Sequence, residues 1–333
     1  MNVVLRFLSF FYQAGCQVKN ALYRTKLLRP KKGPLAVVSV GNIYFGGAEK
    51  TPFVLALVDA FLKKGLKPAV ITRGYKGKWE RQGGVLTGDK IHTAAWTEPG
   101  DEPFMISVNY PEVGVFVGKN RLLSCTNARN MGFDVAILDD GFQHRRLYRD
   151  IDIVLHDPSV HHPLREPLSS IARADILLLK KNADSQARLD VLRTRHGVDI
   201  FPYSVSIGGV YDLDRVKTPE SEIKDKRALA FCGIARPERF LKLLEHSGIE
   251  LIHFMAFPDH YHYPSKSLKK IVRHFDARKA EVCLTTEKDS VKIKEKEELR
   301  HIPTFYLKIV FRTEEDLFAK IYSKLNWKGF PDV

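Results

Sequence analysis

Residues 35–53 read LAVVSVGNIYFGGAEKTPF. An apolar run rich in β-branched residues leads into a glycine pair, followed by Lys50, Thr51 and a helix-forming segment that extends to residue 64. Strand, glycine-rich loop and helix in this order are typical of nucleotide-binding proteins, where backbone N–H groups at the start of the helix hold phosphate oxygens. The stretch therefore predicts an α/β fold that binds a nucleoside triphosphate.

The predicted phosphate loop gives roles to two side chains. Lys50 is expected to reach the β- and γ-phosphates, and the Thr51 hydroxyl to bind Mg²⁺. We expect the nucleotide-binding residues to be Gly46, Gly47, Ala48, Glu49, Lys50 and Thr51. The strict pattern G-x-x-x-x-G-K-[ST] is not met, because Tyr44 and Glu49 stand at its two glycine positions. A glycine-rich turn before an ordinary helix is the competing interpretation of this stretch alone.

Further along the chain, short apolar segments alternate with helix-forming ones. The expected strands cover residues 67–72, 113–117, 134–138, 151–156, 174–180, 228–233, 250–256 and 281–285. This alternation is typical of a mostly parallel sheet with helices on both faces, and ligands then gather at the carboxyl ends of the strands. We expect a P-loop (RecA-like) α/β domain, a second, smaller α/β lobe and an N-terminal amphipathic helix. The predicted boundaries are 1–33 for a membrane-associating segment, 34–205 for the P-loop domain, 206–226 for a polar connector and 227–333 for the second lobe.

The composition limits the function classes. The chain has 333 residues, of which 44% are hydrophobic, and this supports a large buried core in two domains. Its 53 basic and 39 acidic residues give a net charge of +14, which indicates an anionic partner such as a phosphate ligand, an acidic lipid or nucleic acid. The four cysteines are scattered without CxxC spacing, at Cys16, Cys125, Cys232 and Cys283. They argue for reduced thiols and against a disulfide framework or a zinc site.

The first 33 residues differ from the rest of the chain. Apolar side chains recur at helical spacing at Val3, Val4, Phe7, Leu8 and Phe11. Residues 17–33 then carry six basic residues and no acidic one. The apolar stretch is too short to span a bilayer and contains Arg6, so we expect an interfacial helix beside an anionic membrane surface. Two alternatives stay open: a helix packed on the protein's own core, and a secretory or lipoprotein signal ending at Cys16.

The sequence contains two acidic pairs, one after a predicted strand and one in a predicted turn. Asp139 and Asp140 come directly after the apolar segment 134–138, where a nucleotide enzyme places a carboxylate that binds Mg²⁺. The plainer interpretation of these two residues is a pair of acids that cap a turn. Asp101 and Glu102 stand in a Gly-Asp-Glu-Pro turn, which taken alone favours a structural role.

Histidines and arginines give weaker signals. His260 follows a predicted strand, where a general base and a structural loop are both consistent with the sequence. A basic cluster beside His144 contains Arg145, Arg146 and Arg149, and it either holds phosphate or solvates a helix face. A further group, His156, His161 and His162, matches no common zinc spacing and favours a polar loop over a metal site.

Seven motifs occur in one order along the chain. They are VGNxxxGGxxKTP at 40–52, RGY at 73–75, GDEP at 100–103, LDDGFQH at 138–144, REP at 165–167, FPDHY at 257–261 and TTEKD at 285–289. This set resembles the tetraacyldisaccharide 4′-kinase (lipid A 4′-kinase) family, from the N-terminal helix to about residue 294. LDDGFQH is the most specific of the motifs, and seven motifs in order argue against coincidence.

The resemblance implies an ATP-dependent kinase that phosphorylates the 4′-hydroxyl of a tetraacyl disaccharide 1-phosphate in lipid A biosynthesis. It implies a peripheral enzyme at the cytoplasmic face of the bacterial inner membrane, with ATP and Mg²⁺ as cofactors. The expected partners are the acylated disaccharide 1-phosphate and the membrane surface, with no nucleic acid and no obligatory protein partner.

The resemblance also implies roles for individual residues. The implied catalytic residues are Asp101, His260, Lys50 and Asp139, with Asp101 and His260 paired to activate the sugar hydroxyl. The implied metal-binding residues are Thr51, Asp139 and Asp140. The implied substrate-binding residues are Arg73, Tyr75, Glu102, Arg121, His144 and Glu166.

The phosphate loop is where the chain departs from this family, which has Gly-Gly-Thr-Gly-Lys-Thr in place of Gly-Gly-Ala-Glu-Lys-Thr. If position 49 needs a positive φ, glutamate costs about 1–2 kcal/mol in strain. Its charge also repels the triphosphate unless a cation neutralises it. We expect weaker ATP binding than in a variant with glycine at position 49, without loss of activity.

Two other functions stay open on the sequence alone. A catalytically weak, membrane-associated P-loop nucleotide-binding protein would keep the fold and lose the chemistry, and the intact Asp101, Asp139, Asp140 and His260 argue against it. A nucleic-acid-binding P-loop ATPase is suggested by the net charge of +14. Against it, the basic excess lies near the N-terminal apolar helix and no nucleic-acid module is recognisable.

Overall fold

The structure is a computed structural model that describes residues 15–45, 49–88, 90–159, 164–181 and 198–325. The apolar stripe predicted in residues 3–11 lies outside the described residues, and so do Gly46, Gly47 and Ala48 of the phosphate loop. His161 and His162 lie outside them as well.

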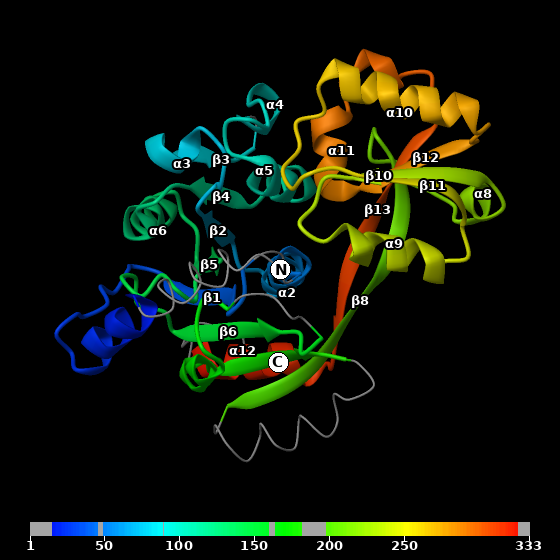
Figure 1. The fold of residues 1–333 in the computed structure, drawn as a ribbon. Helices are drawn as coiled ribbons and strands as arrows, with labels where there is room; N and C mark the ends of the chain where they lie inside the picture. Colours follow the sequence, from blue (N-terminus) through cyan, green and yellow to red (C-terminus); the bar gives the residue numbers. More distant parts are fainter. Residues whose placement is uncertain (1–14, 46–48, 89, 160–163, 182–197, 326–333) are drawn as a thin grey trace.

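A mixed sheet of 13 strands runs through the described part of the molecule (Figure 1). The strands are β1 (Ala36–Asn42), β2 (Pro68–Thr72), β3 (Gly84–Leu86), β4 (Gly114–Val117), β5 (Val135–Asp139), β6 (Ile151–His156), β7 (Ile176–Lys180), β8 (Asp199–Asp212), β9 (Lys217–Thr218), β10 (Arg227–Cys232), β11 (Glu250–Ala256), β12 (Val282–Thr286) and β13 (Thr304–Thr313). Their order in the sheet is β11-β10-β12-β13-β8-β7-β6-β1-β5-β2-β4-β3, and β9 pairs with β8. Only the pairs β8–β13, β3–β4 and β8–β9 are antiparallel among the described strands, so the predicted mostly parallel α/β fold is confirmed.

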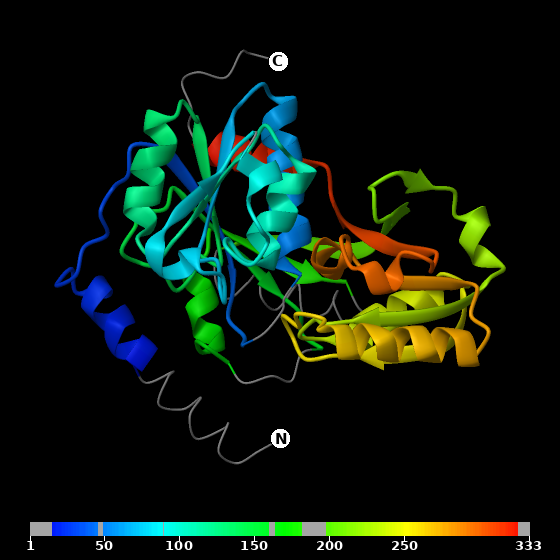
Figure 2. The ribbon, with the colours of Figure 1, turned by 90° about the horizontal axis from the view of Figure 1, so that it is seen from above.

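Helices cover both faces of this sheet. They are α2 (Lys50–Lys63), α3 (Trp79–Gln82), α4 (Lys90–Thr93), α5 (Asp101–Asn109), α6 (Arg121–Asn130), α8 (Ser221–Lys224), α9 (Pro237–His246), α10 (Ser265–Ala277), α11 (Glu287–Ile293) and α12 (Asp316–Leu325), with 3₁₀ turns at Leu168–Arg173 and Glu297–Leu299. Residues 15–24 form a further helix at the outside of the molecule (Figure 2).

The first lobe contains β1 to β7. β1 lies between its parallel partners β5 and β6 and is almost completely buried. A parallel strand covered on both faces needs a continuous apolar sequence, which explains the β-branched run that precedes the phosphate loop. Gly41 at the end of β1 leaves room for the next turn, since a Cβ there would lie 2.5 Å from the Cβ of Phe142. The end of β1, which leads into the phosphate-loop sequence, and the LDDGFQH motif therefore lie next to each other.

Two long strands connect the lobes. β8 pairs with β7 of the first lobe through its first residues, and β13 pairs with β12 of the second lobe through residues 304–307. β8 and β13 pair with each other in antiparallel register between 203–212 and 305–313. Figures 1 and 2 show this ribbon passing from one lobe to the other.

The second lobe is built on β10, β11 and β12, which form one end of the sheet, with helices on each face. Leu268 and Ile271 of α10 pack in an apolar cluster on one face, and Phe240 and Leu244 of α9 pack in a separate cluster on the other. This lobe faces the carboxyl ends of first-lobe strands, and the two lobes enclose a cleft lined by Lys50 and Thr51 on one side and by His260 on the other.

Helices and strands of the structure cross or fall within some of the boundaries predicted from the sequence. Residues 199–212 form one strand that crosses the boundary predicted at 205, and the segment expected as a polar connector contains β9 and α8. Leu317 and Ile321 of α12 pack in the core of the first lobe. We propose that α12 belongs to the first lobe, and the other predicted boundaries stay predictions.

Candidate active site

One cleft of about 1020 Å³ lies between the lobes. Residues from the ends of β2 and β5 and from the starts of α2 and α5 line it on the side of the first lobe. The start of α9, the loop after β11 and the start of α11 line it on the side of the second lobe. Most of the residues that the sequence singles out lie along this cleft, although they come from positions 49 to 288.

Glu49 takes the left-handed conformation that the loop pattern reserves for glycine. It is the residue before α2, with φ 57° and ψ 31°, and its side chain does not cap the helix. Lys180 Nζ donates to both Glu49 carboxylate oxygens at 2.5 and 2.7 Å, and Arg239 Nη1 lies 3.1 Å from Oε1. The glutamate charge is therefore neutralised by two cations, neither of which is in the phosphate loop.

A second carboxylate completes this arrangement. Asp157, at the end of β6, accepts a hydrogen bond from Arg239 and lies 3.8 Å from Lys180 Nζ. We call Glu49, Asp157, Lys180 and Arg239 the Glu49 network. Three of its members come from the first lobe, and Arg239 comes from α9 of the second.

Lys50 and the acidic pair lie next to one another. Lys50 Nζ is 3.1 Å from Asp140 Oδ1, and Arg165 Nη1 donates to the same carboxylate at 2.9 and 3.1 Å. Burial alone would raise the pKa of Asp140, but the charges of Lys50 and Arg165 hold it well below its usual range. Thr51 follows in the first turn of α2 and also lines the cleft.

Asp139 is in a different electrostatic position from Asp140. Thr72 Oγ1 donates to Asp139 Oδ2 at 3.2 Å. Burial raises the pKa of Asp139 to about 6, and the nearby carboxylates of Glu102 and Asp140 add to the shift. Asp139 is thus a buried carboxylate whose surroundings carry too little positive charge.

Asp101 and His260 meet across the cleft. The Nδ1 atom of His260 lies 2.9 and 3.0 Å from the two Asp101 oxygens. Asp101 begins α5 behind Gly100, whose φ of 97° favours glycine, and His260 itself has a positive φ of 61°. The GDEP and FPDHY motifs therefore form one acid–imidazole pair from two lobes.

Two lysines of α11 surround this pair. Lys288 Nζ lies 3.0 Å from Glu102, 3.3 Å from Asp259 and 3.8 Å from Asp101. Lys292, which is fully buried, lies 2.7 Å from Asp289 and 3.5 Å from Asp101. We call Asp101, Glu102, Asp259, His260, Lys288, Asp289 and Lys292 the His260 cluster.

The charges of the His260 cluster fix its ionisation. Burial would raise the pKa of Asp101, but the hydrogen bond from His260 and the nearby lysines hold it well below its usual range. Burial would lower the pKa of Lys288, and the carboxylates around it raise it instead. The carboxylate of Asp101 therefore stays ionised and accepts the hydrogen bond of the imidazole.

The predicted substrate-binding residues lie in two places. Arg121 and His144 line the cleft; burial lowers the pKa of Arg121 to about 10, and burial with nearby cations lowers that of His144 to about 4. Arg73 pairs with Glu80, and Tyr75 is exposed, with its ring centroid 5.5 Å from that of His260. Both of them, with Glu102, also line the cleft.

Glu166 lies away from the cleft lining, below the N-terminal helix. Asn20 Nδ2 donates to Glu166 Oε2 at 2.6 Å, and Arg173 Nη2 donates to the same oxygen at 2.7 Å. Lys19 of the same helix donates to the Gln143 carbonyl at 3.0 Å and lines the cleft. The helix of residues 15–24 is therefore held beside the site by the REP and LDDGFQH motifs.

Several residues at the cleft were missed by sequence reasoning. Lys288 and Arg165 stand inside the TTEKD and REP motifs, so their motifs gave a signal that was not assigned to them. Lys180 and Arg239 stand outside every motif. Arg236, the residue before α9, is 6% exposed, and its Nε and Nη2 atoms have no hydrogen-bond partner among the described residues.

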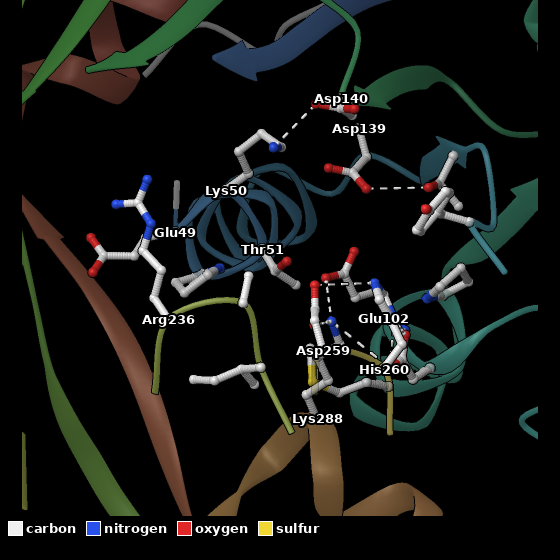
Figure 3. A pocket seen from close by; sticks show the side chains of 18 of the residues that line it. Glu49, Lys50, Thr51, Glu102, Asp139, Asp140, Arg236, Asp259, His260 and Lys288 are labelled. Atoms are coloured by element: carbon white, nitrogen blue, oxygen red, sulfur yellow. Dashed lines mark hydrogen bonds and ion pairs between the residues drawn. The ribbon is translucent and has the colours of Figure 1, made fainter. Parts of the chain in front are cut away.

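The arrangement combines three chemical capacities. A helix N-terminus with Lys50 can hold a polyphosphate, Asp139 can bind a cation, and the Asp101–His260 pair can accept a proton from a hydroxyl group. Figure 3 shows Glu49 and Arg236 on one side of this constellation and His260 on the other.

Comparison with known proteins agrees with this chemistry. The chain matches the family described as tetraacyldisaccharide-1-P 4′-kinase over residues 1–326. The tetraacyldisaccharide 4′-kinase of Syntrophus aciditrophicus is 36% identical over 335 residues, which cover 94% of this chain and 89% of that protein. The protein of the same name from Aquifex aeolicus is 32% identical over 325 residues, covering 94% and 96%.

A solved structure extends the likeness to three dimensions. The crystal structure of LpxK from Aquifex aeolicus in complex with ATP has a TM-score of 0.76 and 30% sequence identity. The match covers 97% of this chain and 98% of that one. The chain therefore belongs to the tetraacyldisaccharide-1-P 4′-kinase family.

Proposed function

We propose that the protein transfers the γ-phosphoryl group of ATP to the 4′-hydroxyl of a tetraacyl disaccharide 1-phosphate. The observation that carries this proposal is the Asp101–His260 pair, which faces the same cleft as Lys50. A nucleotide-binding loop alone would fit many proteins. A proton acceptor opposite the loop is what phosphorylation of an alcohol requires in addition.

The acid–imidazole pair supplies the base. Because the Asp101 carboxylate accepts from Nδ1, the neutral imidazole keeps its lone pair on Nε2. In the proposed reaction Nε2 takes the hydroxyl proton as the oxygen attacks the γ-phosphorus and the bond to the β-phosphate breaks. Asp101 then stabilises the imidazolium, and ADP leaves with the bridging oxygen.

Cations around the cleft align the nucleotide. We propose that Lys50, which here pairs with Asp140, contacts the β- and γ-phosphates of bound ATP, while Arg121 lies close to the acidic pair. Arg236 reaches the cleft from the second lobe with two guanidinium nitrogens unpaired among the described residues. We propose that Arg236 donates hydrogen bonds to bound ATP, since a buried cation without partners is costly.

The donor set at the acidic pair fits Mg²⁺. Asp139 has the raised pKa of a carboxylate short of positive charge, whereas Asp140 is already paired with Lys50 and Arg165. We propose Thr51 and Asp139 as the principal Mg²⁺ ligands, with Asp140 close by. When bound, the ion would neutralise charge on the phosphates. Among the described residues no group of three or more His, Cys, Asp or Glu forms a metal site, and Mg²⁺ needs only one or two carboxylates beside phosphate oxygens.

The N-terminal segment suits a lipid substrate. Val18, Leu27 and Leu28 are exposed apolar side chains in a segment that is otherwise rich in lysine and arginine. No helix in the described part of the chain has the length and apolar character needed to cross a membrane. We propose that this segment binds an anionic membrane surface, at the cytoplasmic face of the bacterial inner membrane, where the acylated acceptor would reside.

A transfer assay tests the proposed function. The full-length protein is incubated with [γ-³²P]ATP, Mg²⁺ and the disaccharide 1-phosphate in detergent micelles, next to Lys50→Ala and Asp139→Ala. We expect labelled lipid from the wild type and little from either variant. Wild-type protein that binds ATP and yields no labelled lipid would instead be the catalytically weak nucleotide-binding protein.

A further inference from the structure

Glu49, which stands where the phosphate-loop pattern has the glycine before the lysine, also pairs with Arg239 of the second lobe. Glu49 lies directly before Lys50, and its side chain is 14% exposed. A carboxylate at this position commonly caps the helix start, but the Glu49 side chain makes no such hydrogen bond. It pairs instead with Lys180 and Arg239. The positive φ of Glu49 orients its carboxylate in this way while the backbone keeps the geometry of a glycine.

The network is balanced in charge. Two carboxylates, Glu49 and Asp157, face two cations, Lys180 and Arg239. Lys180 lies 2.5 Å from Glu49 and 3.8 Å from Asp157, and Arg239 lies 3.1 Å from Glu49 and also pairs with Asp157. Glutamate at position 49 therefore adds no net negative charge beside the triphosphate. Removing its carboxylate would leave Asp157 as the only anion in the network for Lys180 and Arg239.

Arg239 makes this a link between lobes. Lys180 and Asp157 end the neighbouring strands β7 and β6 of the first lobe, so their positions are fixed by the sheet. Arg239 belongs to the first turn of α9 and is the second-lobe member of the network. The ion pair from Arg239 to Glu49 thus attaches the residue before Lys50 directly to α9.

We propose that Glu49 is a positioning residue, and that its ion pair with Arg239 holds the start of α2, with Lys50, against the second lobe in the geometry that binds ATP. The proposal rests on the loop being the ATP site. It explains how a non-glycine residue is accommodated there. It also reverses the expectation drawn from the sequence that glycine at position 49 favours ATP binding, because two cations neutralise the Glu49 carboxylate.

A double-mutant cycle tests the ion pair. The variants are Glu49→Gln, Arg239→Gln and the double variant, with Glu297→Gln as the control, because Glu297 pairs with Arg300 at an exposed site of the second lobe. Each is assayed for ATP KM, kcat at saturating ATP and melting temperature. We expect each single variant to raise the ATP KM about fivefold to tenfold and the double variant to be no worse than either, with kcat within about twofold of wild type.

Two further variants separate positioning from other roles. Arg239→Lys keeps the charge and should restore most of the ATP affinity, whereas Glu49→Gly should raise the ATP KM although it removes backbone strain. Effects that multiply in the double variant would overturn the proposal. So would a lower melting temperature with an unchanged KM, or a lower KM in Glu49→Gly.

The outcome is distinguishable from failure of the kinase function. If the wild type makes no labelled lipid, the proposed function is wrong, and the proposal that rests on it is wrong as well. If the wild type is active and the cycle shows no coupling between positions 49 and 239, only the positioning role is wrong.

Discussion

The lobes meet across the cleft at two charged junctions, the His260 cluster and the Glu49 network, which differ in their balance of charge. The His260 cluster contains four carboxylates against two lysines, besides the imidazole. The Glu49 network has two carboxylates and two cations, and Arg236 lies beside it.

This difference matches what each junction has to bind. In the His260 cluster a carboxylate accepts from Nδ1 of the imidazole, and this arrangement suits a proton acceptor. A polyphosphate is repelled by a net negative charge. The Glu49 network carries no net charge, so it permits ATP to bind beside it. A single interlobe cleft can therefore hold a proton acceptor and a phosphate site side by side.

The largest expected effect comes from the proton-accepting junction. Asp101→Asn leaves the size of the side chain unchanged and removes the charge that stabilises the imidazolium. We expect kcat to fall by about 10²- to 10⁴-fold, with ATP KM almost unchanged. Steady-state kinetics with the lipid acceptor measure both constants.

The same junction predicts non-additivity. His260→Asn should cost about as much as Asp101→Asn, and the double variant should be little worse, because the pair acts as one base. Losses that multiply would mean that the two residues act separately, and the contrast between the junctions would lose its chemical basis.

Asp139, the proposed Mg²⁺ ligand, predicts a dependence of stability on pH. Its pKa is raised to about 6, so the folded protein holds this proton more tightly than the unfolded chain, in which the value is near 3.8. Stability therefore falls as the pH rises from about 4 to 6 and stays lower above that range. Without nucleotide at pH 7.5, Asp139→Asn should raise the free energy of unfolding by about 1–3 kcal/mol while turnover falls.

Urea denaturation at pH 7.5 and pH 4 measures this effect, with the exposed Asp225→Asn as the control. The gain should vanish at pH 4, where the carboxyl group is protonated in the folded state. A variant that is less stable than wild type at pH 7.5 would show that Asp139 is already compensated by its neighbours.

The sequence predicted the elements around β1 because strands buried on both faces leave continuous apolar runs. It also brought Asp101 and His260 together, through a family resemblance and not through their spacing of 159 residues. The segment from 203 read as polar because Ser204, Ser206 and Gly208 alternate with apolar residues along a half-buried ribbon. That period-two alternation is typical of a strand.

The Glu49 network was beyond sequence reasoning for a physical reason. Lys180 lies 131 residues from Glu49, and it and Arg239 stand among many other basic residues of a chain with net charge +14. No local pattern distinguishes a cation that pairs across a cleft from one that faces water. Only the docking of α9 against the ends of β6 and β7 selects these two.

Arg236 tests whether the second junction serves ATP at all. Arg236→Gln removes a buried guanidinium group that we propose donates to the nucleotide, and charged hydrogen bonds of this kind contribute about 1.5–3 kcal/mol. We expect the ATP KM to rise about tenfold or more, with kcat at saturating ATP largely retained. The matched control is Arg273→Gln on the outer side of α10, where the arginine is exposed. A fall in melting temperature with an unchanged KM would make Arg236 a structural residue.

His144 offers the smallest effect and a separate measure of how basic the cleft is towards the N-terminal helix. Burial lowers its pKa to about 4, and the charges of Arg121 and Lys19 act in the same direction. Between pH 6.5 and 4 the unfolded chain takes up a proton that the folded protein does not, so stability falls as the pH is lowered through this range. Relative to His144→Gln, the wild type should lose about 1 kcal/mol more between pH 7.5 and pH 5.5. The exposed His246→Gln is the control, and equal losses in wild type and His144→Gln would mean that the cations near the N-terminal helix do not act on the cleft.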